Sequence, residues 1–257
     1  LATLLAATLF TPCQAQSTTW GKIHYKGRPW VENVSRPNTI SHGLQGRHLS
    51  LWASHGRYYD IGKGEWRWQR PLLFCTTEDL YTQTLVVPYL IPMLENAGAN
   101  VFTPRERDWQ RNEVIVDNDQ RSSGYLEFTT KEPWKLTGKP GFALHGGTYA
   151  DLENPFQAGS ARQVKARKRR KRLSEASYQP YFPEPGRYAV YVSYQTLPKS
   201  VDDAEYTVYH KGQATTFHVN QQMGGGTWVY LGTFDFDRGS NAYNRVVLSN
   251  YSRSKGV

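Results

Sequence analysis

The sequence predicts an α/β part followed by an all-β module of the sandwich or jelly-roll-like type. Three observations predict this arrangement. Residues 48–103 show a strand–helix–strand pattern, which is typical of a βαβ unit with a parallel sheet. After Val114 the helical periodicity fades. Short runs in which apolar and polar residues alternate, with turn residues between them, then recur along the chain, as they do in β-sandwiches.

The first strand is predicted at residues 48–54, after a polar and turn-rich lead-in over residues 17–47. The run HLSLWAS alternates, so Leu49, Leu51 and Ala53 share one face. An alternation of this kind is the period of a half-buried strand.

A helix is expected after a long loop over residues 57–75, which is rich in Tyr, Trp and Arg. Thr77 is a suitable N-cap, and two acids follow it in the first turn, where the helix dipole favours negative charge. Pro88 and Pro92 must kink or divide the helix, because proline removes a backbone donor. Gly98 is a suitable C-terminal cap.

The remaining predicted strands are short and separated by turn residues. They are residues 99–103 in the α/β part and residues 188–194, 204–209, 215–219, 227–234 and 245–249 in the β-module. The number and spacing of the later strands favour two packed sheets.

The net charge of +9 comes almost entirely from one segment. Residues 161–172, ARQVKARKRRKR, hold eight Lys or Arg and no acid, which leaves a charge of +1 for the rest of the chain. A run this dense repels itself, so we expect a plain solvated loop. Contact with an anionic envelope polymer is the alternative. No nucleic-acid partner is expected, because no aromatic residue interleaves the run.

Residues 1–16 read as the later part of a secretory signal, because an uncharged apolar stretch ends in small and polar residues. We therefore expect an exported protein of the periplasm, the cell envelope or the extracellular space. The stretch is too short to span a membrane, and no transmembrane helix is expected. Cys13 follows Pro12, a poor fit to a lipid-anchored cysteine. Removal of the signal leaves Cys75 alone, and we expect it to be a buried small hydrophobe.

His55 and Glu78 are the strongest candidates for chemistry. His55 follows the first predicted strand and Glu78 opens the next helix, so both lie at the sheet edge where ligands gather. Imidazole and carboxylate are suitable ligands for Zn²⁺, whose catalytic sites use three protein ligands and a water. The alternatives without a metal are a simple turn at His55 and a helix-start acid at Glu78.

The segments LSLWASHGRYYD and TTEDLYTQTLVVPYLIPMLENAGANVFTPRERD resemble the start of the zinc-dependent N-acetylmuramoyl-L-alanine amidase fold. They are similar in particular to a branch in Bacteroidetes-type bacteria that is often labelled xanthan lyase-like. The resemblance implies that residues 17–112 are the incomplete N-terminal part of such a domain, with His55 and Glu78 as ligands of Zn²⁺. The family's third ligand and general base are expected downstream of Val257, and His145 is treated as structural.

The second half resembles the golvesin/xanthan-lyase carbohydrate-binding-like module. The matching runs are VIVDND, PEPGRYAVYVSY, AEYTVYHKG, VNQQMGGGTWVYLGTFDF and VVLSN. The resemblance implies that residues 113–257 form a β-sandwich module without its last strand, and that this module binds carbohydrate or acts as a spacer. Trp228 lies in one of these runs, either as a sugar contact or as a core residue.

Three functions are consistent with these patterns. The first is an exported zinc hydrolase that cleaves the amide between the lactoyl group of N-acetylmuramic acid and L-alanine in peptidoglycan, with this fragment inactive alone. The second is a non-catalytic carbohydrate-binding protein in which Trp66 and Trp68 stack on a glycan. The third is a polysaccharide lyase of the xanthan type, for which no group of residues stands out. Arg105 is a candidate to orient substrate, and the expected partner is peptidoglycan or another glycan.

Overall fold

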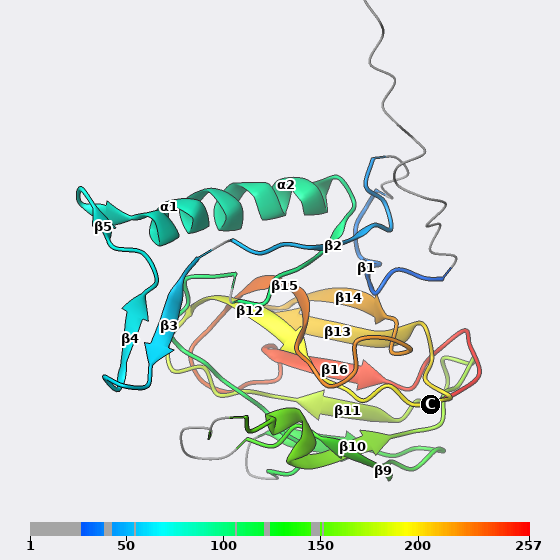
Figure 1. Cartoon of the computed structure of the whole chain (residues 1–257). Coiled ribbons are helices and arrows are strands. Elements are labelled where there is room, and N and C mark those ends of the chain that lie inside the picture. Colours follow the sequence, from blue (N-terminus) through cyan, green and yellow to red (C-terminus); the bar gives the residue numbers. More distant parts are fainter. Residues whose placement is uncertain are drawn as a thin grey trace, which may run out of the picture.

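A helical layer lies above a β-rich body in the computed structural model (Figure 1). The structure describes residues 27–38, 43–53, 55–105, 107–120, 124–144, 150 and 152–257. The predicted signal over residues 1–16, with Cys13, and the residue His145 lie outside the described residues. Among the described helices, none is long and apolar enough to cross a membrane.

The helical layer has the strand–helix–strand order that the sequence predicts. Its elements are β2 (His48–Ser50), α1 (Glu78–Leu85), the π-helical turn η1 (Val86–Leu90), α2 (Ile91–Asn96) and β7 (Asn100–Phe102). Strands β2 and β7 pair in parallel, with Leu49 opposite Val101. Leu49 and Leu51 pack against a small core cluster that contains Ile91, which is only 1% exposed. The predicted parallel pairing and the predicted apolar face are confirmed.

The ends and the break of the helix also follow the sequence. The Thr77 side chain accepts a hydrogen bond from the Leu80 N–H at 3.2 Å, which makes Thr77 the N-cap. The helix changes to a π-helical turn around Pro88, in agreement with the expected division. After the helix, Gly98 has a φ of +101°, and a Cβ there would lie 2.9 Å from Gln45 Cα. Only glycine fits this conformation and this close approach.

The expected long loop over residues 57–75 is wrong. The chain forms two short hairpins there, β3 (Arg57–Asp60) with β4 (Glu65–Trp68), and β5 (Leu72–Leu73) with β6 (Thr76–Thr77). The β3 run, RYYD, shows no apolar and polar alternation, and the β4 run, EWRW, alternates over only four residues, which is too short to indicate a strand by itself. Cys75 is exposed rather than buried, because it lies in the turn between β5 and β6.

The β-module consists of a six-stranded antiparallel sheet faced by two strand pairs. The order in the large sheet is β1–β14–β13–β16–β11–β8. Its strands are β1 (Val31–Asn33), β8 (Tyr125–Phe128), β11 (Glu175–Tyr178), β13 (Ala204–His210), β14 (Gln213–Val219) and β16 (Arg245–Ser249). The pairs are β9 (Lys135–Gly141) with β10 (Gly159–Gln163), and β12 (Gly186–Val192) with β15 (Val229–Phe236). This arrangement agrees with the predicted β-sandwich.

The main hydrophobic core lies between the large sheet and the β12–β15 pair. Val208 and Phe217 of the large sheet pack in one cluster with Tyr188, Phe182 and Phe236. The Phe182 and Phe236 rings are stacked, with centroids 4.4 Å apart. A smaller cluster lies between the large sheet and the β9–β10 pair, and it contains Tyr125, Trp134, Val164 and Ala176.

One strand of the large sheet comes from the expected extended lead-in. Val31 and Asn33 of β1 lie opposite Val219 and Phe217 of β14. A strand of three residues is too short to show alternation, so the sequence did not indicate this pairing. The sheet therefore draws its outer strand from the N-terminal part of the chain.

The helical layer is fixed to the β-module at two places. The Trp30 ring stacks on Phe102 at 4.0 Å, and its Nε1–H donates to the Tyr194 hydroxyl at 2.7 Å. Gly224 lies against this indole with a φ of +70°, and a Cβ there would come within 1.8 Å of Trp30 Cζ2. At the second place, the Arg107 guanidinium lies 3.8 Å from the ring centroid of Tyr230.

The prediction of a plain solvated loop for the basic run 161–172 holds only in part, because residues 168–172 are exposed and irregular while the rest of the run is tied to the sheet. Its first residues belong to β10, and three of its arginines bind carboxylates. The pairs are Arg162 with Glu127 at 2.6 Å, Arg167 with Glu132 at 3.8 Å and Arg170 with Glu205 at 2.7 Å. The three acids are distant in sequence, so the local charge pattern could not reveal them.

Candidate functional site

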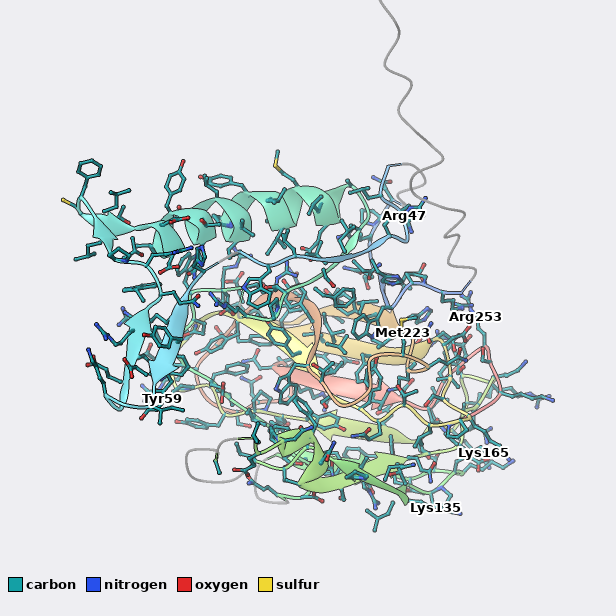
Figure 2. All side chains as sticks on the ribbon, in the orientation of Figure 1. Arg47, Tyr59, Lys135, Lys165, Met223 and Arg253 are labelled. Atoms are coloured by element: carbon teal, nitrogen blue, oxygen red, sulfur yellow. The ribbon has the colours of Figure 1, made fainter. Side chains whose placement is uncertain are left out.

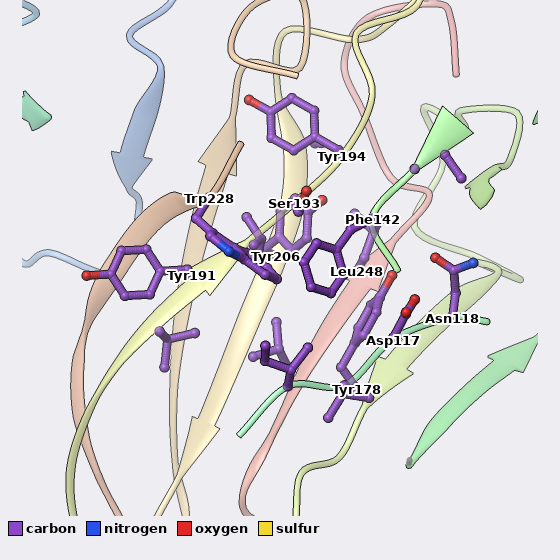
Figure 3. A pocket seen from close by; sticks show the side chains of 18 of the residues that line it. Asp117, Asn118, Phe142, Tyr178, Tyr191, Ser193, Tyr194, Tyr206, Trp228 and Leu248 are labelled. Carbon is purple, nitrogen blue, oxygen red and sulfur yellow. The ribbon is translucent and has the colours of Figure 1, made fainter. Parts of the chain in front are cut away.

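A cavity of about 800 Å³ lies in the β-module, lined by both the large sheet and the facing strand pairs (Figure 3). Tyr206 and Leu248 line it from β13 and β16. Tyr191 lines it from β12, and Trp228 directly precedes β15. The volume falls within the range of about 300–1,000 Å³ that is typical of ligand sites.

Three aromatic rings form a cluster at this cavity. Phe142 and Trp228 have centroids 4.8 Å apart, and Phe156 lies 5.6 Å from Trp228 and 5.5 Å from Phe142. Trp228 is 39% exposed although it also lines the cavity, so its indole lies at an opening. The two phenyl rings hold the indole in place while one part of it meets solvent.

The opposite side of the cavity in Figure 3 carries polar groups. Asp117 is buried, and its carboxylate accepts hydrogen bonds from the N–H groups of Asp119 at 3.2 Å and Leu144 at 3.0 Å. The Asn118 side-chain amide donates to the Ser160 carbonyl at 3.2 Å and to the Ser160 hydroxyl at 3.1 Å. These bonds fix the position of both side chains before any ligand arrives.

Two tyrosines of the cavity wall are kept protonated by burial. Burial raises the pKa of Tyr178 above its ordinary value, and the neighbouring charges of Glu127 and Asp117 act in the same direction. Burial also raises the pKa of Tyr194, whose hydroxyl donates to the Met223 carbonyl at 2.8 Å. The cavity therefore presents phenol groups rather than phenolates.

The comparison with protein families concerns this part of the chain. Residues 143–257 match the family model of the Golvesin C-terminal domain. This segment is similar to that domain, and we call the β-module that contains it the golvesin-like domain. The match leaves residues 1–142 outside, so neither the amidase resemblance nor zinc is supported by it. A search among curated proteins finds no match.

One solved structure is similar, a xanthan lyase from Paenibacillus. The sequence identity is 24% and the TM-score is 0.40, over 56% of this chain. The chain spans only 12% of that lyase.

Three tryptophans were predicted as site residues: Trp66, Trp68 and Trp228. Only Trp228 lies at the cavity of the golvesin-like domain. The sequence did not point to Phe142, Phe156, Asp117 or Asn118 as partners of Trp228. Phe142 and Phe156 lie in segments whose sequence shows neither the helical nor the strand periodicity. The run VIVDND contains the two polar residues, but only the fold shows that they line the same cavity as the indole.

The predicted pair of His55 and Glu78 is brought together at the edge of the helical layer. His55 lies between β2 and β3, and Glu78 is the first residue of α1. The distance between His55 Nε2 and Glu78 Oε1 is 4.0 Å. Arg70 lies beside both, with Nη2 at 3.0 Å from His55 Nε2 and Nε at 3.9 Å from Glu78 Oε2. The imidazole and the carboxylate thus share a guanidinium neighbour.

These residues fit part of a zinc site and not a complete one. A nitrogen and an oxygen donor 4.0 Å apart are within reach of a single ion. Among the described residues, however, no three His, Cys, Asp or Glu side chains form a group that could hold a metal. The positive charge of Arg70 at the same two atoms also opposes a cation. No catalytic step through zinc follows from this geometry.

The other predicted site residues are Arg105, which lies between the cavity and the His55–Glu78 pair, and two tryptophans of the β3–β4 hairpin. Arg105 donates from Nη1 to the His55 carbonyl at 2.8 Å and also lines the cavity, so it touches both. Trp66 is 64% exposed and meets Tyr59 edge-on at 5.7 Å. Trp68 is half-buried, and the Arg57 guanidinium lies 4.7 Å from the centroid of its ring. Both tryptophans are in the β3–β4 hairpin, apart from Trp228.

Proposed function

We propose that the golvesin-like domain binds carbohydrate, with Trp228 as the surface on which a sugar ring stacks. The half-exposed indole at the opening of the cavity carries this proposal. Tryptophan offers a flat apolar face with a polar edge, which suits the CH-rich face of a pyranose. Phe142 and Phe156 fix the indole, so little side-chain entropy is lost on binding.

The polar side of the cavity supports the same proposal. Asp117 and Asn118 offer carboxylate and amide oxygens, and buried tyrosine hydroxyls lie nearby. Apolar walls with a few fixed polar groups are the usual composition of small-molecule sites. The proposed ligand is a segment of peptidoglycan or of another glycan, and an exported protein of the cell envelope would meet such polymers.

Replacement of Trp228 by Ala is expected to weaken glycan binding by about tenfold or more, because truncation of a central tryptophan in a binding site commonly costs about 2 kcal/mol or more. The measurement is isothermal titration calorimetry of the whole chain against solubilised peptidoglycan and a panel of neutral polysaccharides.

The matched control is Trp66→Ala, which removes an exposed tryptophan away from the cavity. We expect its glycan affinity to equal that of the wild type. If Trp66→Ala abolished binding while Trp228→Ala did not, the hairpin would be the sugar-binding surface instead.

As a second candidate, we propose that His55 and Glu78 supply two ligands of a Zn²⁺ in a hydrolase of the N-acetylmuramoyl-L-alanine amidase type. The distance of 4.0 Å between the two donor atoms favours this candidate. The remaining ligands and the general base would come from outside the described residues. A zinc ion in such a site supplies a water of lowered pKa.

Calorimetric titration of Zn²⁺ into the whole chain tests this candidate. Weak binding is expected, with loss of the signal in His55→Ala and Glu78→Gln. The Arg70→Gln variant is expected to bind Zn²⁺ more tightly than the wild type, because a repelling cation is removed. The control is Glu65→Gln, an exposed acid in the neighbouring hairpin. Zinc binding that persists in both ligand variants would place the ion elsewhere and reject the candidate.

A further inference from the structure

The segment 165–172 presents five cations that no acidic side chain of the described chain neutralises. We name this segment the basic loop. All five residues are exposed, and the ion pairs of the structure do not include them. They are Lys165, Lys168, Arg169, Lys171 and Arg172.

The basic loop is held firmly by its other two basic residues. The Arg167 N–H donates to the Asn250 carbonyl at 2.7 Å, and the Ser252 N–H donates to the Arg167 carbonyl at 3.0 Å. The Arg170 guanidinium binds both Glu205 oxygens and lies 3.8 Å from the ring centroid of Tyr251. The exposed cations are therefore presented from a fixed backbone and not from a free tail.

Neighbouring segments add further positive charge. Thr130 donates to the Arg172 carbonyl, which brings the exposed Lys131 next to the basic loop. The exposed Arg253 directly follows Ser252, which is bonded to Arg167. Figure 2 places Lys165 and Arg253 toward the same end of the molecule.

The acidic side chains near the basic loop, Glu132, Glu205 and Asp203, already bind other groups of the protein. Glu132 pairs with Arg167, and Glu205 pairs with Arg170. The Asp203 carboxylate accepts hydrogen bonds from the Ser252 hydroxyl and the Arg253 N–H. None of these carboxylates is left to screen the exposed cations, so this end of the domain carries an excess of positive charge.

We propose that the basic loop binds an acidic polysaccharide whose carboxylates repeat along the chain. Several exposed cations on a fixed loop match a ligand with regularly spaced anions. Residues 168–172 include no aromatic face on which nucleobases could stack and no apolar side chain for insertion into a membrane. The Tyr251 ring is covered by Arg170. This site is independent of Trp228 and goes beyond the sugar stacking proposed above.

A variant with all five exposed cations changed to Gln tests the proposal against polygalacturonate oligomers. The whole wild-type chain is expected to bind them in 50 mM salt at least about tenfold more tightly than the variant. The wild-type affinity is also expected to fall as the salt concentration rises, because ions screen exposed charges. Binding is measured by calorimetry, and thermal unfolding verifies that the variant is folded.

The control variant removes five exposed cations elsewhere, at Arg36, Lys63, Arg111, Arg187 and Arg238. Its net charge equals that of the test variant, and it is expected to bind polygalacturonate like the wild type. Equal weakening in both variants would show a net-charge effect without a site and would overturn the proposal. Tighter binding of single-stranded DNA or of anionic vesicles than of polygalacturonate would overturn the assigned ligand class. Neither result would alter the role proposed for Trp228, because that role is also measured with neutral polysaccharides.

Discussion

Replacement of Arg107 by Ala is expected to lower the free energy of unfolding by about 3–5 kcal/mol, because it leaves a partly buried carboxylate without its partner. Arg107 is only 6% exposed in its side chain, and both of its terminal nitrogens donate to Glu95 at 2.7 Å. The same guanidinium covers the Tyr230 ring of β15. The measurement is urea unfolding followed by tryptophan fluorescence.

The pKa of Arg107 shows that Glu95 stabilises its positive charge. Burial alone would lower the pKa of Arg107, but the hydrogen bonds that Arg107 donates to Glu95 raise it above its ordinary value. A double variant, Arg107→Met with Glu95→Leu, is therefore expected to recover most of the lost stability, since both charges are removed together.

An exposed ion pair provides the control. Arg67 binds Asp60 at 3.3 Å, and its side chain is 42% exposed. Replacement of Arg67 by Ala should cost less than about 1 kcal/mol. If Arg107→Ala cost no more than this control, the guanidinium would not be what joins the helical layer to the β-module.

The Glu205→Gln variant is expected to lose about 2–3 kcal/mol of stability at neutral pH. Burial opposes ionisation of Glu205, but His218 and Arg170 outweigh it and lower the pKa of this carboxyl to about 2. Ser249 also donates a hydrogen bond to it at 3.1 Å. These partners stabilise the charged form, which Gln cannot provide.

The pH dependence of this loss has a defined sign. A carboxyl whose folded pKa is lowered stabilises the protein fully above its ordinary pKa of 4.5. That contribution falls as the pH drops from 4.5 toward 2. The stability difference between wild type and Glu205→Gln should therefore shrink through this window, as measured by urea unfolding at several pH values. Glu113→Gln, at an exposed position, should show no such trend. A constant difference for Glu205→Gln would contradict the role of its charge.

The strands of the golvesin-like domain could be predicted where one face is buried. Strand β16 has the predicted bounds Arg245–Ser249, and β13 extends the predicted strand 204–209 by one residue. Alternation of apolar and polar residues indicates a strand with one buried face, and the sequence of β13 shows this alternation. The β3–β4 hairpin could not be found in this way, because neither face of it is buried.

The sequence predicts only those parts of the candidate sites whose residues lie in secondary-structure elements that are neighbours along the chain. His55 and Glu78 meet because a parallel strand–helix unit places the end of one element beside the start of the next. Phe142 and Asp117 line the cavity because segments far apart in the sequence pack together. Packing of this kind produces no periodic pattern or motif that the sequence alone would reveal. The partners of the basic run were missed for the same reason, since Glu127 and Glu205 are far from it along the chain.

Strand β1 has a consequence for the solution behaviour of the golvesin-like domain. Val31 to Asn33 cover the outer backbone groups of β14. A polypeptide that began at residue 113 would leave this row of amides and carbonyls bare, and bare rows recruit strands from other molecules. Strand β1 therefore covers this edge of the sheet, and its proteolytic removal is expected to expose β14 to strand pairing between molecules.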